Sequence, residues 1–235
     1  MSEPLYLSRL TLRHTPEIAP LINVLQPAAH AERNEIDHRL IWSAMPEEVQ
    51  REHAGSSANR APFLWRRDDK PGRYYVLGPE PSRQLNLFEV ETKPFEAHLS
   101  PGDKLQFVLR VNATVDRRSG GRTTRARHDI AMDLLHAVPN SERAEQRHAL
   151  AEKAARDWLS TRAGTSGFSL DALHLDGYRA VVIRRNPNKP GRIGVFDLRG
   201  LLTVTDPAVF LARITSGFGR AKAFGCGLML IRRAD

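Results

Sequence analysis

The chain has 235 residues, of which 41% are hydrophobic and 26% are charged, so composition excludes wholesale disorder and suits one large or two small globular domains. The formal net charge is +8, and arginine supplies most of the positive charge. The first residues do not resemble a signal peptide, no stretch is apolar enough to span a bilayer, and the single cysteine excludes an intrachain disulfide, so we expect a cytoplasmic protein without a membrane partner.

Alternating hydrophobicity marks the strands in the first half of the chain, and one helix interrupts them. Apolar residues at helical spacing predict this helix over residues 34–45, and Pro46 ends it. A Pro71-Gly72 turn joins two of the strands into a hairpin. Residues 54–60 and the Arg-, Thr- and Gly-rich residues 113–128 are expected to be loops. The predicted strands are residues 5–13, 63–67, 74–77, 85–91 and 104–111.

The clearest helix of the chain is expected over residues 141–162. This segment is rich in Ala, Glu, Arg and Leu, which all favour helix. Asn140 and Ser141 stand at its start and are the candidate N-caps, and Gly164 follows its end.

The remainder of the chain predicts a hairpin, a helix and a last strand. The hairpin tip is expected at residues 186–191, which hold two prolines and a glycine. Asp206 before Pro207 is typical of a helix start, so residues 208–215 are expected to be helical. The predicted strands of this part are residues 168–170, 177–185, 192–205 and 228–231.

The order of these elements predicts an α+β fold. It reads β-α-β-β-β and then α-β-β-β-α-β, which two tandem ferredoxin-like (RRM-like) halves with antiparallel sheets would explain. The boundary is expected between residues 113 and 140. We therefore assign residues 1–125 to the N-terminal half, which carries the helix at 34–45, and residues 126–235 to the C-terminal half.

Basic residues gather in two segments. Residues 178–235 hold eleven Arg or Lys and three acids, and residues 110–127 hold six Arg and one acid. Localised basicity of this kind favours a polyanionic partner, nucleic acid before membrane. The alternative is a solvated basic surface without a polyanionic partner.

A glycine-rich segment lies near the C-terminus, between residues 217 and 227. Its four glycines alternate with Arg220 and Lys222, and glycine allows backbone amides to approach a phosphate closely. It is neither a Walker A loop nor a Rossmann turn, because the spacing is wrong and a helix precedes it while a strand follows. The alternative is a turn in which glycine serves close packing at a sheet.

His38, on the helix at 34–45, is the second candidate for chemistry. Its neighbours Ile41 and Trp42 are apolar, so a structural core histidine is the alternative, and His30 is a rival nearby. No Cys or His cluster has zinc spacing and no set of acids resembles a magnesium site, so we expect neither a metal nor a cofactor.

These segments together resemble the CRISPR repeat-processing endoribonucleases, most closely the CasE subunit family of the type I-E Cascade complex in the RAMP superfamily. The glycine-rich segment resembles the signature of that family. The resemblance runs nearly end to end, and the other segments that carry it are Leu5–Leu10, Glu35–Trp42, Phe107–Ala113, Ala151–Leu159 and Phe196–Pro207.

The resemblance implies a metal-independent endoribonuclease that cleaves CRISPR repeat hairpins in precursor crRNA and retains the 3′ hairpin within Cascade. RNA attack by its own 2′-hydroxyl would leave a 2′,3′-cyclic phosphate and a 5′-hydroxyl. The implied partners are the repeat RNA and other Cascade subunits. His38 is implied as catalytic residue, with Glu35 as its candidate assistant. The candidate RNA-binding residues are Arg110, Arg117, Arg118, Arg122, Arg125, Arg184, Arg185, Lys189, Arg192, Gly217, Gly219, Arg220, Lys222 and Gly225.

The chain departs from the family pattern at two positions beside the histidine. Glu35 stands where the family often has a tyrosine, and Ser43 stands where some members have a lysine. An ionised carboxylate cannot replace a phenol as a donor, so the second catalytic group stays open. The alternatives are a non-catalytic module that binds RNA hairpins and an assembly subunit of a CRISPR ribonucleoprotein.

Overall fold

The computed structural model describes residues 4–27, 30–54, 62–82, 86–118, 125–183 and 191–234. The chain divides into two compact units, each built from three segments. Unit 1 comprises Met1–Ala97, Val182–Gly191 and Ala221–Leu228, and unit 2 comprises His98–Val181, Arg192–Arg220 and Met229–Asp235.

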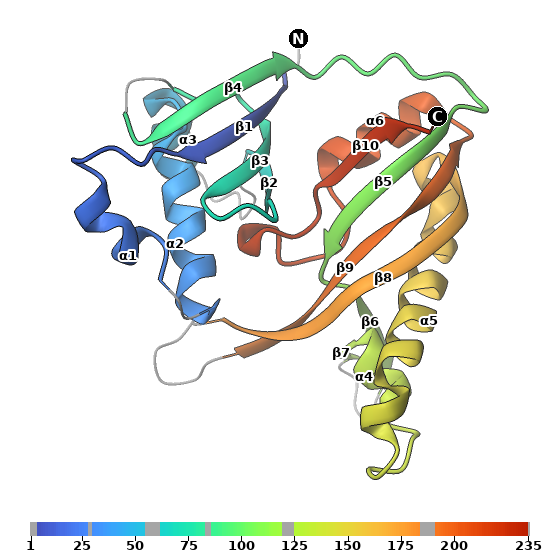
Figure 1. The fold of residues 1–235 in the computed structure, drawn as a ribbon. Helices are drawn as coiled ribbons and strands as arrows, with labels where there is room; N and C mark the ends of the chain where they lie inside the picture. The colour runs from blue at the N-terminus through green and yellow to red at the C-terminus, as the bar shows by residue number, and fades with distance from the viewer. Residues whose placement is uncertain are drawn as a thin grey trace. The chain divides into compact units, whose positions relative to one another are not determined.

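Unit 1 is a four-stranded antiparallel sheet with its strands in the order β2-β3-β1-β4 (Figure 1). This is the ferredoxin-like order, in which the first strand lies between the third and fourth. The predicted hairpin is confirmed by the antiparallel pairing of β2 with β3. The elements are β1 (Tyr6–Leu12), η1 (Ala19–Leu21), α1 (Ile22–Leu25), α2 (His30–Ser43), α3 (Glu47–Ala54), β2 (Leu64–Arg67), β3 (Arg73–Gly78), β4 (Phe88–Pro94) and η3 (Lys222–Phe224).

The core of unit 1 lies between the sheet and helix α2. Along β1 the buried residues are Ser8, Leu10 and Leu12, which confirms the alternation read from the sequence. Helix α2 supplies Leu40 and Ile41 to the same apolar cluster. Burying one face of the sheet against one stripe of the helix fixes which α2 residues remain accessible.

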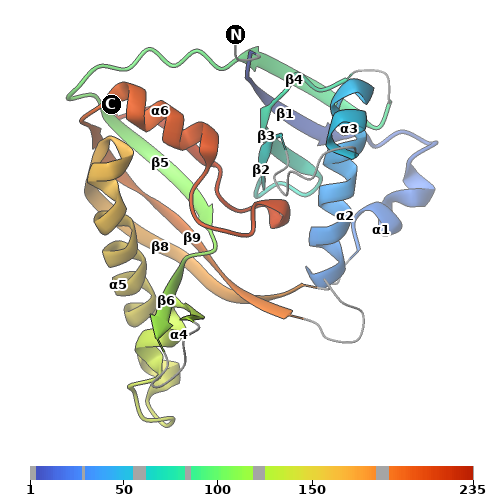
Figure 2. The same cartoon turned by 180° about the vertical axis from the view of Figure 1, so that it is seen from behind.

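Unit 2 holds a second four-stranded sheet, with its strands in the order β10-β5-β9-β8, again the ferredoxin-like order. Helices α5 and α6 lie on one face of this sheet (Figure 2). The tandem ferredoxin-like fold class predicted from the sequence is confirmed. The elements are β5 (Lys104–Val111), β6 (Thr114–Arg118), β7 (Arg125–Asp129), α4 (Ile130–Leu135), α5 (Arg143–Ala163), η2 (Gly164–Ser166), β8 (Phe168–Ile183), β9 (Gly191–Val204), α6 (Pro207–Ser216) and β10 (Met229–Arg233).

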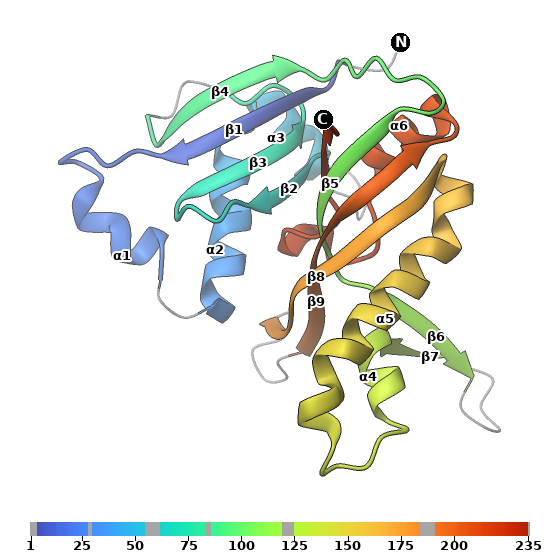
Figure 3. The same cartoon turned by 45° about the vertical axis from the view of Figure 1, so that its right-hand side comes forward.

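Three local predictions for this part were wrong. Residues 113–128 are not all loop: β6 and β7 pair as an antiparallel ribbon beyond the main sheet (Figure 3). The segment 168–170 and residues 177–183 of the other predicted strand belong to one long strand, β8, while residues 184 and 185 lie outside the described part of the structure. Strand β5, assigned to the first half, pairs with β9 and β10 in the second sheet. Long-range pairing decided each case, because polar or interrupted runs carry a weak strand signal.

The helix starts show how far capping can be read from sequence. Asp206 caps α6 as predicted, since its Oδ1 accepts the backbone N–H of Val209 at 3.0 Å. The predicted caps of α5 were wrong: its N-cap is Glu142, which makes no side-chain capping hydrogen bond. Among the described residues, no helix is both long and apolar enough to cross a membrane.

Candidate functional site

His38 lies on α2 against a group of aromatic side chains in unit 1. Its ring centroid is 6.2 Å from that of Phe63, 6.2 Å from that of Trp42 and 6.5 Å from that of Trp65, the last in a stacked arrangement. Phe63 and Trp65 are buried, while His38 itself is half-buried. The imidazole therefore has an apolar base and one accessible side, unlike a core histidine that is fully enclosed.

The protonation of His38 follows from this environment. The indole Nε1–H of Trp42 donates to Nε2 of His38 over 3.2 Å, which places the proton of a neutral ring on Nδ1. Burial lowers the pKa of His38, and the nearby charge of His53 lowers it further. Because its pKa is lowered, His38 is neutral at physiological pH, which is the form in which an imidazole can accept a proton.

The sequence missed a buried polar network directly beside His38. Asp37 is completely buried, and its Oδ1 accepts the Tyr74 hydroxyl at 2.6 Å. Its Oδ2 accepts Nε–H of Arg67 at 2.8 Å. Because Arg67 lies on β2 and Tyr74 on β3, this network fixes the rotation of α2 against the sheet and, with it, the direction of His38. A lone acid on an otherwise apolar helix face was the only signal for it in the sequence.

His53 was also missed. It lies on α3, and its ring centroid is 4.7 Å from that of Trp42, the residue whose indole N–H donates to His38. Glu35 and His30, the predicted assistants of His38, both lie on α2, but their side chains are outside the described part of the structure. His53 is therefore the histidine whose side chain the structure places near His38.

The second half of the glycine-rich segment lies in unit 1, against the helix of His38. Its short helix η3, which begins at Lys222, contacts both α2 and β2. Gly225 has φ +74°, and a Cβ at this position would lie 3.1 Å from the Trp65 ring. Only glycine meets both conditions without strain. This part of the segment therefore packs under the aromatic group that holds His38.

The first half of the segment lies in unit 2 and packs on the end of β5. Gly217 ends α6 with φ +75°, and Gly219 has φ +64°. A Cβ on Gly219 would lie 2.7 Å from the carbonyl oxygen of Asn112. Arg220 follows, with its backbone N–H bonded to that same oxygen at 3.1 Å and its side chain exposed. Gly219 therefore serves close packing, and an RNA-binding role for Gly217, Gly219 and Gly225 stays a prediction.

Two of the predicted RNA-binding arginines are engaged by acids of unit 2. Nε of Arg110 lies 2.6 Å from Oδ1 of Asp197, whose Oδ2 accepts a hydrogen bond from Arg179 at 2.7 Å. Burial acts to raise the pKa of Asp197, but the two guanidiniums outweigh it and lower this pKa. NH2 of Arg117 lies 2.6 Å from Asp133. Their positive charge is thus partly neutralised within the protein.

The other predicted arginines and lysines divide into two groups. Arg192 is exposed at the start of β9, and Lys222 is half-buried in η3. The side chains of Arg118 and Arg125, and the whole of Arg122, Arg184, Arg185 and Lys189, lie outside the described part of the structure. Within the described residues no group of three or more His, Cys, Asp or Glu could hold a metal ion.

The sequence matches one known protein family over nearly its whole length. A family model described as "CRISPR associated protein" matches residues 5–233, almost the entire sequence. The chain belongs to this family of CRISPR-associated proteins. Among curated proteins, by contrast, none matches the sequence.

Solved structures show the same fold for this CRISPR-associated protein. A structure of the CRISPR endoribonuclease Cse3 bound to a 19-nucleotide RNA is similar at 22% identity with a TM-score of 0.64, and the match covers 99% of this chain and 100% of that one. The Thermus thermophilus Cse3 bound to an RNA representing a pre-cleavage complex gives 22% identity, coverage of 98% and 100%, and a TM-score of 0.63. The CRISPR-associated protein Cas6e from Escherichia coli K-12 is similar at 21% identity with a TM-score of 0.54, and the match covers 97% of this chain and 100% of that one.

Proposed function

We propose that this protein is an endoribonuclease that cleaves the repeat hairpin of precursor CRISPR RNA without a metal ion. The observation that carries the proposal is the state of His38, a neutral imidazole of lowered pKa on an aromatic base with one accessible side. Relatives of the same fold, described as the endoribonuclease Cse3 bound to RNA, support it. His38 is assigned as the catalytic residue.

The reaction uses a nucleophile that the RNA itself supplies, the 2′-hydroxyl beside the scissile phosphate. His38 takes the hydroxyl proton at Nε2, so the 2′-hydroxyl replaces the indole of Trp42 as the donor to this atom. The 2′-oxygen bonds to phosphorus while the bond from phosphorus to the 5′-oxygen breaks, and a proton passes to the 5′-oxygen. The products are a 2′,3′-cyclic phosphate and a 5′-hydroxyl.

The remaining catalytic and binding roles stay with the residues named from the sequence. Glu35, three residues before His38 on α2, is proposed to assist it. Arg220 and Lys222 are proposed to offset the negative charge that builds on the phosphate. The hairpin that carries Arg184, Arg185, Lys189 and Arg192 is proposed to contact the RNA stem, whose A-form groove is recognised through shape and backbone.

Product retention is the second part of the proposal. The cleaved hairpin is proposed to stay bound, so that the protein remains at the 3′ end of the crRNA within a Cascade complex. A chain of the same fold lies in a structure described as a CRISPR RNA-guided surveillance complex, at 17% identity with a TM-score of 0.59. The basic C-terminal segment supports tight retention of a polyanion.

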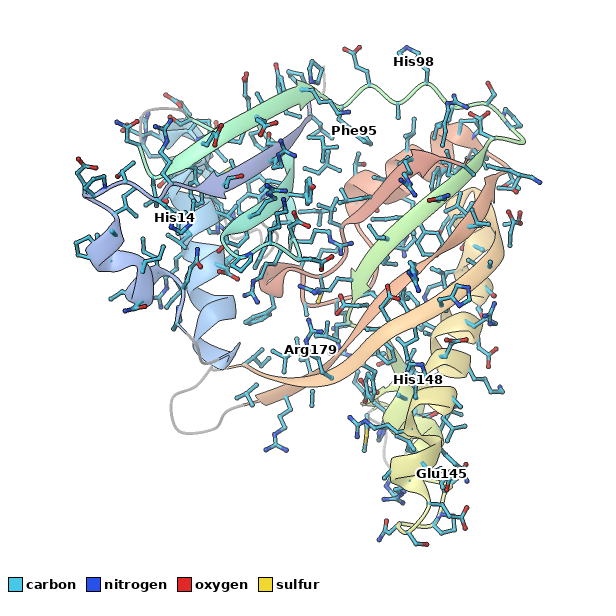
Figure 4. The ribbon with its side chains drawn as sticks, in the orientation of Figure 1. His14, Phe95, His98, Glu145, His148 and Arg179 are labelled. Carbon is cyan, nitrogen blue, oxygen red and sulfur yellow. The ribbon has the colours of Figure 1, made fainter. Side chains whose placement is uncertain are left out.

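The test is cleavage of a labelled repeat hairpin in the presence of EDTA by the wild type, His38→Ala and His14→Ala. His14 is an exposed histidine of unit 1 and serves as the matched control (Figure 4). We expect the wild type and His14→Ala to produce a cyclic phosphate, and His38→Ala to bind the hairpin without cutting it. Cleavage by His38→Ala at the wild-type rate would remove His38 from the mechanism.

Glu35 in the place of a tyrosine favours one other function, a module that binds the hairpin without cutting it. In that case the wild type and both variants would bind the RNA equally tightly and none would cleave it. A 2′-deoxy substitution at the scissile position separates the two functions further, because it blocks cleavage and leaves binding unchanged.

A further inference from the structure

Two guanidinium groups lie on the helical face of unit 2, where the end of α5 is next to α6 (Figures 2 and 3). Arg162 belongs to the last turn of α5, and its Cζ is 4.4 Å from the centroid of the Trp158 ring. Arg213 belongs to the last turn of α6, and its Cζ is 5.1 Å from the centroid of Phe218. Each guanidinium therefore rests on an aromatic face, which restricts its movement.

Neither guanidinium pairs with a carboxylate of the described residues. Arg162 donates from NH1 to the backbone oxygen of Trp158 at 2.9 Å, and Nε of Arg213 is buried without a hydrogen-bond partner there. Burial and then the charge of Arg213 lower the pKa of Arg162. Since α6 contacts the short helix η2 that directly follows α5, the two half-buried cations lie in one region, where a bound anion would reduce their repulsion.

Several other arginines of unit 2 pair with a carboxylate. Arg110 and Arg179 share Asp197, and Arg199 lies 2.9 Å from Asp176. Among the described residues, the pair at the ends of α5 and α6 has two cations and no paired carboxylate, so an anion from outside the unit can supply the counter-charge.

The chemistry of the pair fits a phosphate group. A guanidinium presents parallel N–H donors that match two phosphate oxygens, and aromatic stacking leaves its N–H edge available. Phe218, whose ring lies under the Arg213 guanidinium, is the second residue of the glycine-rich segment, and the exposed Arg220 follows two residues later. A chain with a net charge of +8 and an RNA partner favours a backbone phosphodiester over a protein carboxylate.

We propose that Arg162 and Arg213 form one phosphate-binding site that holds a backbone phosphodiester of the bound RNA. The site would act together with the segments already named and would contribute to affinity, not to the chemical step. The identity of the ligand as RNA rests on the proposed function, whereas the affinity of the pair for phosphate does not.

The first measurement is RNA affinity as a function of NaCl concentration, with a repeat hairpin made non-cleavable by a 2′-deoxy substitution. The variants are Arg162→Gln, Arg213→Gln and the double variant. Lys153→Gln is the control, because it removes one charge from the same helix at an exposed residue paired with Asp157. We expect each arginine variant to bind more weakly and to lose up to about 0.9 from the slope of log K against log salt, with no further loss in the double variant.

The second measurement uses inorganic phosphate alone and does not depend on the RNA. Phosphate is expected to raise the melting temperature of the wild type and of Lys153→Gln, and to have a smaller effect on the double variant. If the wild type bound no repeat RNA, the proposed function would fail while this phosphate result could still support the site.

Three results would overturn the proposal. They are an unchanged salt dependence in both arginine variants, an equal effect of phosphate on wild type and double variant, and weakened binding of partner subunits with unchanged RNA affinity. The last would assign the pair to a protein carboxylate. Arg162→Lys and Arg213→Lys keep the charge and much of the packing, so they replace the glutamine variants if those fail to fold, and loss of the planar fork is still expected to weaken RNA binding.

Discussion

Replacing Asp37 with leucine tests whether the buried network beside His38 holds α2 in place. Asp37 is 0% exposed, and it accepts hydrogen bonds from Tyr74 at 2.6 Å and from Arg67 at 2.8 Å. Removing one partner of a buried ion pair costs about 3–5 kcal/mol, because the remaining charge loses its counter-charge in a poorly solvated place. We expect the free energy of unfolding to fall by about this amount, measured by urea unfolding followed by tryptophan fluorescence.

A second variant separates the contribution of the ion pair to stability from the contribution of packing. The triple replacement Asp37→Leu, Arg67→Met and Tyr74→Phe removes all the polar groups together, and an apolar substitute for a buried pair is often neutral or stabilising. We expect it to recover most of the lost stability. A loss below about 1 kcal/mol in Asp37→Leu alone would refute the reasoning, since an uncompensated buried guanidinium should cost more.

The same triple variant tests the link to catalysis. If the network sets the direction of His38, the triple variant should bind the repeat hairpin with wild-type affinity but cleave it more slowly in a single turnover. Cleavage at the wild-type rate would show that the network serves the fold alone.

Two further predictions concern the surroundings of His38. His53→Gln removes a neighbouring charge and is therefore expected to raise the pKa of His38. The rise should be modest, because burial is the larger cause of the lowered pKa and remains in the variant. An NMR titration of His38 measures this pKa, and a lower value in the variant would contradict the assignment. Gly225→Ala is expected to destabilise the protein by about 1–3 kcal/mol, because it places a Cβ 3.1 Å from the Trp65 ring at a backbone φ of +74°. Thermal or urea unfolding measures the loss. An unchanged stability would mean that the glycine-rich segment does not pack as described.

Local patterns in the sequence were sufficient for several elements that bury one face. The alternation in β1, the helix α2 ended near Pro46, and the Asp206-Pro207 start of α6 all have short-range causes. The ribbon of β6 and β7 could not be read in this way, because its strands are rich in charged residues and carry no buried stripe. Its pairing is a property of two segments, not of either alone.

The sequence by itself determined the class of fold, and it singled out His38 and the glycine-rich segment as candidates for function. Tertiary structure alone decided what surrounds them. Asp37 meets partners 30 and 37 residues away, and Gly225 reaches Trp65 from the opposite end of the chain. The physical reason is that burial, pKa and charge compensation depend on which distant residues come together, and a linear pattern does not record those contacts.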